Sequence, residues 1–380
     1  MWKIFLRKNF FGFFKKQWLN QELPLKKLFL FLSPLFILLV VTIPFLSMDT
    51  AGYLLPIKNY LAFGFNPYQT PFLQVVQNPW VLQIGHPWAS SLVTPYGPFF
   101  FLLLAPLVSL PFGLTVTIVI YKALLLVPYI FSVIIFDRLR SFFKTPPFVT
   151  VLFALNPLLL ILGLLEGHND LILEAFILAA IWLLLKEKFF HGNLALAAIV
   201  AIKLFPIIFA PIFWFEHGLF RWRKVIFSFL IIFGFFFLTS LFFGFSTLLS
   251  LVKTVAFQSS LGCFYICSPV QFFFNLFSVS LSVKLAFFLI VYSLIFWLFL
   301  LRSFKPVQFI FWSLMAFCFI YLRWLTPWYL MLPLPLALLL FENKKYRFWA
   351  GFLTIYAVWL SLWANVGFFG ILWEKILSIL

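Results

Sequence analysis

Residues 158–185 read LLLILGLLEGHNDLILEAFILAAIWLLL, two apolar runs that flank the polar turn Glu166-Gly-His-Asn-Asp170. A helix needs about 20 apolar residues to cross a bilayer, because lipid offers no hydrogen-bond partner to its backbone. Similar apolar runs recur along the chain at 28–47, 113–136, 147–165, 171–185, 194–215, 225–243, 285–301, 306–322, 327–341 and 348–366. The sequence therefore predicts an all-α, polytopic integral membrane protein.

The composition of the 380 residues agrees with a membrane protein and excludes a soluble one. Hydrophobic residues make up 64% of the chain and charged residues 10%, whereas soluble domains contain about 25% charged residues. In a soluble protein the formal net charge of +17 would suggest nucleic acid as a partner, but the apolar runs argue against that partner here. Three cysteines are too few for a disulfide scaffold or a four-cysteine zinc site.

Basic residues gather in six short groups between the apolar runs, and these groups predict the orientation in the membrane. They are Lys3 to Lys27, Arg138/Arg140/Lys144, Lys186/Lys188, Arg221/Arg223/Lys224, Arg302/Lys305 and Lys344/Lys345/Arg347. The positive-inside rule places such groups in the cytoplasm, and the N-terminus with them. All six can be cytoplasmic only if 96–111 is an interfacial or re-entrant helix and if 194–215 breaks near Lys203-Leu-Phe-Pro206 and returns.

This topology predicts that the polar parts of the chain lie on the extracytoplasmic face. They are the long loop 48–112, the turn 166–170, the loop 244–284 and the turn 323–329. Short basic stretches remain on the cytoplasmic face, with few other polar side chains. We therefore expect the functional face to be extracytoplasmic.

Asp49 follows the first apolar run directly and is the only acidic residue between Glu22 and Asp137. A carboxylate at the edge of the membrane is partly desolvated, which suits it to accept a proton. The alternative interpretation is an aspartate that hydrates a helix end.

Four polar residues, Glu166, His168, Asn169 and Asp170, form the densest polar cluster in the sequence, between two apolar runs. Ionisable residues at a span boundary usually face a cavity or a partner, because facing lipid costs about 2–3 kcal/mol. Metal binding by a single histidine is weakly supported. The alternative interpretation is a polar turn in which Asn169 or Asp170 caps the next helix.

Two basic residues stand out from the cytoplasmic groups. Lys203 interrupts an apolar run three residues before Pro206, so it either extends its amine toward water or meets an anion in a cavity. Arg323 ends another apolar run and precedes Trp324, Trp328 and Tyr329. Its guanidinium can bind a phosphate group in bidentate geometry. The alternative interpretation is an anchor at the membrane interface, a role that arginine and aromatic residues also take.

These residues belong to an ordered series of motifs that resembles the GT-C-fold glycosyltransferases over residues 49–335. The series is Asp49…Tyr53…Gly64-Phe-Asn66-Pro67-Tyr68…Tyr96-Gly-Pro98, Asn156-Pro157…Gly163…Glu166-Gly-His-Asn-Asp170, Lys203-Leu-Phe-Pro206-Ile-Ile-Phe-Ala-Pro211 and Arg323…Pro327-Trp-Tyr329…Leu332-Pro333. It is most similar to the dolichyl-phosphate-mannose-dependent mannosyltransferases of glycolipid-anchor synthesis and their prokaryotic relatives, which use polyprenyl-phosphate sugars.

The resemblance implies about 9–11 transmembrane or re-entrant helices and a long outer loop with juxtamembrane helices. It implies three parts of one membrane domain: a basic segment (1–27), a catalytic module (28–243) and C-terminal helices that complete the donor site (244–380). It also implies an inverting enzyme that moves a hexose, with mannose favoured, from a polyprenyl monophosphate to a lipid- or glycan-linked acceptor.

The resemblance gives roles to individual residues as well. Asp49 matches the catalytic base, and Arg323 and Lys203 match the cations that hold the lipid phosphate. We expect Tyr96 and the cluster Glu166, His168, Asn169 and Asp170 to bind the substrates.

At the first site this chain has Asp49-Thr-Ala51, where the related enzymes often carry two acidic residues spaced by one. The sequence therefore offers no support for a divalent metal, and we assign no metal ligand and no cofactor.

Three alternatives remain at this point, and the dense polar cluster on the outer face argues against one of them, a purely structural membrane subunit. A transporter or flippase of lipid-linked substrates would explain the ionisable residues Lys122, Glu174 and Lys203 within apolar runs and the interrupted helices. The sequence shows no inverted repeat, and its polar residues gather on one face, which argues against transport. A ligase that transfers a glycan from a lipid diphosphate stays within the same fold.

Overall fold

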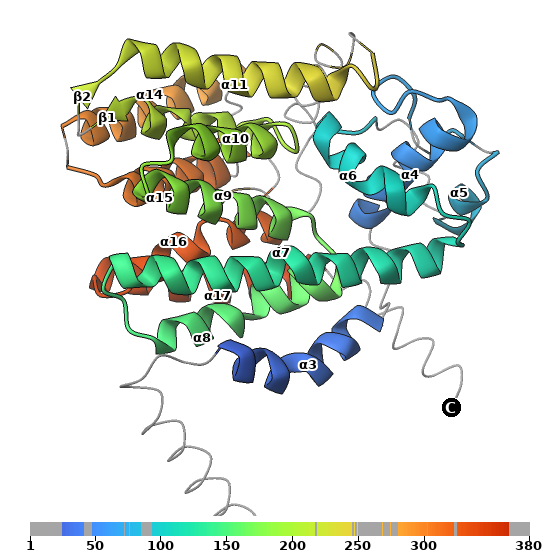
Figure 1. Cartoon of the computed structure of the whole chain (residues 1–380), viewed down its shortest axis with the longest axis horizontal. Helices are drawn as coiled ribbons and strands as arrows, with labels where there is room; N and C mark the ends of the chain where they lie inside the picture. Colours follow the sequence, from blue (N-terminus) through green and yellow to red (C-terminus); the bar gives the residue numbers. More distant parts are fainter. Residues whose placement is uncertain are drawn as a thin grey trace, which may run out of the picture.

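The computed structural model describes residues 25–41, 48–71, 73–75, 77–84, 93–216, 219–244, 247, 249, 268, 274, 280–301, 303–322 and 325–364. About three quarters of these residues are helical (Figure 1), so the predicted all-α class is confirmed. The only strands in the described part of the chain are β1 (Phe215–Glu216) and β2 (Leu219–Phe220), which form a short antiparallel hairpin.

The helices follow the apolar runs of the sequence, with breaks at prolines and polar turns. In chain order they are α3 (Leu25–Val41), α4 (Met48–Phe63), α5 (Pro79–Ile84), α6 (Pro98–Val108), α7 (Leu114–Phe142), α8 (Phe148–Ala154), the π-helix η3 (Leu158–Leu165), α9 (Asp170–Leu185), α10 (Phe189–Val200), the 3-10 helix η4 (Phe205–Phe213), α11 (Trp222–Ser240), α14 (Leu281–Leu300), α15 (Pro306–Ala316), the π-helix η5 (Phe317–Tyr321), the 3-10 helix η6 (Pro327–Met331), α16 (Leu334–Leu339) and α17 (Lys344–Ala364).

Among the described residues, four helical segments are long and apolar enough to cross a membrane: Leu114–Phe142, Phe148–Leu165, Trp222–Ser240 and Ser282–Leu300. Large apolar side chains on the outside of these segments are exposed, among them Leu230 on α11 and Ile290 on α14, each with 66% of its surface accessible. Such faces are unfavourable in water and favourable against lipid tails. The prediction of a membrane protein is confirmed.

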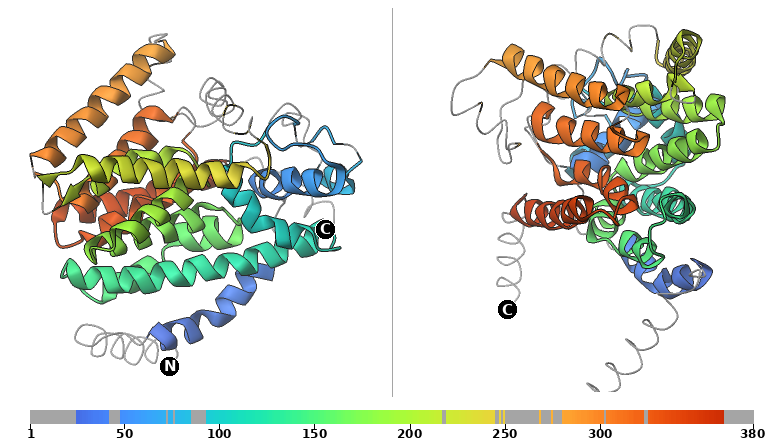
Figure 2. Two further views of the ribbon diagram at one scale, coloured as in Figure 1. Left: turned by 45° about the horizontal axis from the view of Figure 1, so that its top comes forward. Right: turned by 90° about the vertical axis from the view of Figure 1, so that its left-hand side faces the viewer.

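Helices α7, α9, α10 and α11 pack side by side in that order, with their axes along a common direction (Figure 1). Helix α3 contacts α7 and η3, on the opposite side of the bundle from α11 and α14 (Figure 2). The N-terminal half of α7 extends toward α4, α5 and α6, which form a smaller helical group at one end of the bundle (Figure 1). The loop predicted over 48–112 therefore does contain helices.

The two segments that the predicted topology treats as other than full spans contain only short helices. Helix α6 has 11 residues, about 16 Å at 1.5 Å per residue, which is too short to cross a bilayer. Residues 201–204 separate α10 from η4, and η4 then runs back along α10. A Cβ atom on Gly192, near the start of α10, would lie 2.6 Å from the ring of Phe213 at the end of η4. The predicted break near Lys203 is confirmed.

Described members of five of the six basic groups lie at one end of the bundle, which we call the basic end. The Lys186 amine lies 5.2 Å from the ring of Phe142 at the end of α7. A cavity of about 450 Å³ there is lined by side chains of Lys144, Lys305 and Tyr346, among others. The starts of α10, α11, α15 and α17 and the β-hairpin also gather at this end (Figure 1). The polar turn 166–170 lies between η3 and α9, away from it.

Candidate active site

The polar turn Glu166–Asp170 begins where η3 ends, and a glycine allows its sharp bend. Gly167 has a φ of +78°, in the left-handed region that residues with a Cβ atom seldom adopt. The bend brings the turn against two other elements. A Cβ atom added to Gly167 would lie 3.4 Å from Cγ of Lys122 on α7 and 3.6 Å from Oγ1 of Thr50 on α4.

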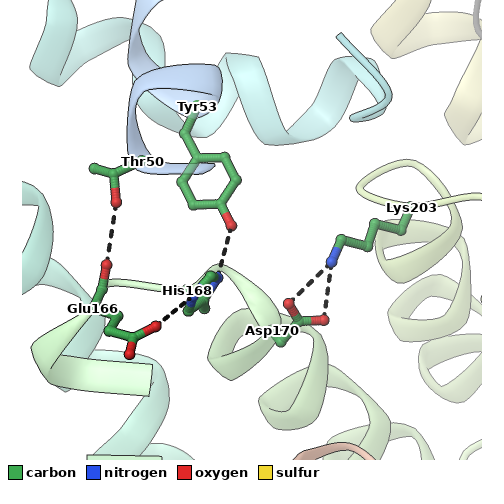
Figure 3. Close-up of polar contacts among 6 residues, drawn as sticks. All are labelled: Thr50, Tyr53, Glu166, His168, Asp170 and Lys203. Atoms are coloured by element: carbon green, nitrogen blue, oxygen red, sulfur yellow. Dashed lines mark hydrogen bonds and ion pairs between the residues drawn. The ribbon is translucent and has the colours of Figure 1, made fainter. Parts of the chain in front are cut away.

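His168 is the most completely engaged side chain of the turn (Figure 3). Its Nδ1 atom lies 3.3 Å from the hydroxyl of Tyr53, and its Nε2 atom lies 3.1 Å from Oε2 of Glu166. Its ring stacks on the indole of Trp328, with centroids 4.1 Å apart and planes 18° apart. His168 therefore joins α4, the polar turn and the start of η6.

The first turn of α4 is tied to the polar turn by a second contact (Figure 3). The Thr50 hydroxyl donates to the backbone carbonyl of Glu166 at 3.2 Å. Asp49 precedes Thr50 in the same helical turn, and its side chain lies outside the described part of the structure. The backbone of α4 thus brings position 49 to the cluster, although position 49 is more than 100 residues away in sequence.

Asp170 and Lys203 form a buried ion pair beside the histidine (Figure 3). The Lys203 amine lies 2.9 Å from Oδ1 and 3.0 Å from Oδ2 of Asp170. It also lies 4.7 Å from the ring centroid of Tyr329 and 5.7 Å from that of Tyr96. The sequence left open whether Lys203 extends toward water or meets an anion, and in the structure its amine meets the carboxylate at the start of α9.

The motif Tyr96-Gly-Pro98 packs against the break that carries Lys203. The amide of Gly97 donates to the carbonyl of Ile202 at 2.7 Å, and the amide of Phe99 donates to the carbonyl of Ala201 at 3.0 Å. A Cβ atom on Gly97 would overlap the Ala201 carbonyl, so only glycine fits. The Tyr96 ring packs edge-on against Tyr53, with centroids 4.9 Å apart.

Asn169 lies between His168 and Asp170 and is fully buried. Neither its side-chain nitrogen nor its side-chain oxygen has a hydrogen-bond partner among the described residues. The two carboxylate oxygens of Glu174, one helical turn beyond Asp170, are also buried without such a partner within the described ranges. Buried polar atoms without partners are rare, which makes these two side chains candidates for contact with substrate.

Tyr68, from the Gly64–Tyr68 motif, lies apart from this cluster. Its ring packs against Phe101 and Phe243, at centroid distances of 6.0 and 5.7 Å. Burial raises the pKa of the Tyr68 phenol well above its usual value, so the side chain stays neutral.

The structure thus brings together the predicted residues Tyr96, Glu166, His168, Asn169, Asp170 and Lys203. Arg323 lies outside the described residues, so its position is not tested. Within the described ranges, no group of three or more His, Cys, Asp and Glu side chains is arranged to hold a metal ion. The roles given to the site residues stay predictions.

Several residues of the cluster were not assigned to the site from the sequence. Thr50, Tyr53, Trp328 and Tyr329 stand next to predicted residues or inside the same motifs, and this proximity was the available signal. Lys122 is buried in α7 beside the turn. A lysine inside an apolar run is a functional signal by itself.

A family of known activity matches the chain. A family model described as alpha-(1->6)-mannopyranosyltransferase, N-terminal domain, matches residues 15–216, which is more than half of the 380-residue chain. No curated protein and no solved structure matches the chain. The resemblance to GT-C-like mannosyltransferases is confirmed by this match, and the transporter alternative is set aside because the family consists of transferases. The chain therefore belongs to the alpha-(1->6)-mannopyranosyltransferase family and is a membrane enzyme that transfers mannose from a sugar donor to an acceptor.

Proposed function

We propose that this enzyme transfers mannose from a polyprenyl-monophosphate donor to a hydroxyl of a lipid- or glycan-linked acceptor, forming an α-(1→6) bond with inversion at the anomeric carbon. The linkage is that of the family description. The observation that carries the proposal is the hydrogen bond from Thr50 to the Glu166 carbonyl. It fixes the helical turn that contains Asp49 against the polar cluster, where a base would be needed.

Asp49 is the proposed catalytic base. Its position in the first turn of α4, directly before Thr50, puts a carboxylate-bearing residue beside the turn 166–170. It would remove the proton from the acceptor hydroxyl as that oxygen attacks the anomeric carbon. General-base catalysis of this kind contributes about 10²–10⁴-fold in rate.

Arg323 is the proposed main contact to the donor phosphate. It follows directly after Leu322, at the end of η5, and precedes the turn that carries Trp328 and Tyr329, which themselves contact His168 and Lys203. Stabilising the charge of a departing phosphate is often the largest catalytic term. Lys203 shares its charge with Asp170, so we assign it a smaller direct share of that task.

The sugar hydroxyls and the acceptor are proposed to bind Tyr96, Glu166, Asn169 and Asp170. The buried amide of Asn169 supports this role, because it offers a donor and an acceptor that no described residue uses.

The site is proposed to face the extracytoplasmic side, with the N-terminus in the cytoplasm. The support is the separation of the polar cluster from the basic end, which the positive-inside rule assigns to the cytoplasm. A polyprenyl tail would then lie among outer-leaflet lipids, with its phosphate at headgroup depth. The turn 166–170 and Lys203 contact Trp328 and Tyr329. These contacts support a single membrane domain in which residues 244–380 complete the site.

The decisive experiment compares Asp49→Asn with Asp137→Asn in purified enzyme, using polyprenyl-phosphate mannose as donor. Asp137 is a matched control, since it pairs with Arg140 at 2.6 Å in the last turns of α7, near the basic end. We expect Asp49→Asn to lose transfer at an unchanged unfolding temperature, while Asp137→Asn stays active. NMR of the anomeric centres shows whether the configuration in the product is the inverse of that in the donor. A fully active Asp49→Asn enzyme would remove Asp49 from the mechanism, and activity only with a lipid diphosphate would replace the donor.

A further inference from the structure

We propose that His168 is a positioning residue, which holds the helical turn of Asp49 and the Trp328 turn in register and does not itself bind the substrate. The proposal rests on the proposed function in one respect, namely that Asp49 is the base. It deepens that function by separating the residues that contact substrate from the residue that aligns them.

The first argument is that the polar atoms of His168 are already used. Nδ1 is hydrogen-bonded to Tyr53 and Nε2 to Glu166. Imidazole has only these two nitrogens for hydrogen bonding, and His168 exposes 1% of its side chain. No ring nitrogen is left for a phosphate oxygen or a sugar hydroxyl.

The second argument concerns the ring faces. Trp328 covers one face of the imidazole at 4.1 Å with nearly parallel planes. This stack is a contact between the two halves of the chain, because His168 lies before α9 and Trp328 lies in η6. A substitution of His168 should therefore displace both α4 and the segment that follows Arg323.

The third argument is the register of α4. Positions 49 and 53 are one turn apart, and residues spaced by four lie on the same helix face. Thr50 bonds to the Glu166 carbonyl, and Tyr53 bonds to the ring that Glu166 also holds. Two contacts, one turn apart, thus fix both the position and the rotation of the turn that carries the base.

The same contacts assign the protonation of one ring atom. The Glu166 carboxylate accepts hydrogen bonds only, so Nε2 of His168 carries a proton whether the ring is neutral or charged. Among the described side chains, the charged or titratable groups near the ring include Glu166, Lys122 on α7 behind Gly167, the Asp170–Lys203 pair and the Tyr53 phenol.

The kinetic test uses His168→Gln, His168→Ala and Tyr53→Phe. A misplacement of about 1 Å in an active site costs about 10²-fold in rate, so we expect kcat of His168→Ala to fall by about that factor with KM for the donor unchanged. Gln keeps an N–H for Glu166 and a flat group against Trp328, so it should restore part of kcat. Tyr53→Phe should lower kcat by a smaller factor. Matched controls are His191→Gln in α10 and Tyr60→Phe, whose hydroxyl bonds to Phe242 outside the cluster.

A rise in KM with kcat unchanged in His168→Gln would show direct substrate contact and overturn the proposal. Unchanged kcat in both Tyr53→Phe and His168→Gln would overturn it too, even if His168→Ala fails to fold. A second readout does not depend on activity. The enzyme has four histidines, so in ¹⁵N-histidine-labelled enzyme the signal of His168 is the one that disappears in His168→Gln. We expect this signal to show a protonated Nε2. An unprotonated Nε2 would contradict the assigned geometry. Activity of Asp49→Asn would refute the base alone and leave this spectrum unaffected.

Discussion

The amine of Lys203 lies within 3.0 Å of both carboxylate oxygens of Asp170, and the two residues come from different ends of different helices. Asp170 begins α9, whereas Lys203 lies in the break between α10 and η4. Both side chains are almost fully buried, with 0% and 8% of their surfaces exposed. The ion pair joins the open end of the α9–α10 hairpin at the site. Each of the two buried charges has the other as its partner.

Removing one member of this pair should destabilise the enzyme more than removing both charges. Breaking a buried ion pair costs about 3–5 kcal/mol, because the remaining charge stays buried without a partner. We expect a large fall in unfolding temperature for Lys203→Met and for Asp170→Asn. The double variant should be more stable than additivity predicts, as measured by a double-mutant cycle. Additive losses would mean that the two side chains do not depend on each other.

Gly97→Ala should disrupt the site through the backbone. The new Cβ atom would overlap the Ala201 carbonyl, and relieving that overlap would separate the Tyr96–Pro98 segment from the break that carries Lys203. We expect lost transferase activity and a lower unfolding temperature. Gly234→Ala in α11 is the matched control, since nothing lies within 4 Å of its added Cβ atom, and alanine favours a helix by about 1 kcal/mol over glycine. Equal behaviour of the two variants would contradict this packing.

The sequence predicted the elements of the site better than their contacts. The turn 166–170 was predictable because polar residues interrupt two apolar runs, and the break near Lys203 was predictable because Pro206 cannot donate a backbone hydrogen bond. Nothing in a spacing of 33 residues indicates that Asp170 and Lys203 pair, since that contact depends on how α10 and η4 fold back.

The C-terminal apolar runs were predicted as continuous spans and proved to be divided. The run 306–322 changes from α15 to the π-helix η5, and the run 327–341 splits into η6 and α16. Pro333 and Pro335 remove backbone donors where the second run divides. The stack of Trp328 on His168 joins segments 160 residues apart, and hydrophobic periodicity carries no information on such a contact.

Asn169→Leu should separate stability from function. The amide is buried and has no partner among the described residues, so its replacement by an apolar group of similar volume forfeits no described hydrogen bond and relieves a desolvation cost of about 1–3 kcal/mol. We expect an unchanged or higher unfolding temperature together with a higher KM for donor or acceptor. A marked loss of stability at unchanged KM would instead assign Asn169 to the fold.

Cysteine labelling in intact cells can test the orientation of the site. The three native cysteines are first replaced by serine, and single cysteines are then placed at Gln69, in the loop after α4, and at Glu342, at the basic end. Both positions are exposed. If the basic end is cytoplasmic, a membrane-impermeant maleimide should label position 69 in intact cells and position 342 only after permeabilisation. Labelling in the reverse pattern would put the polar cluster on the cytoplasmic face, and an outer-leaflet donor could not then reach it.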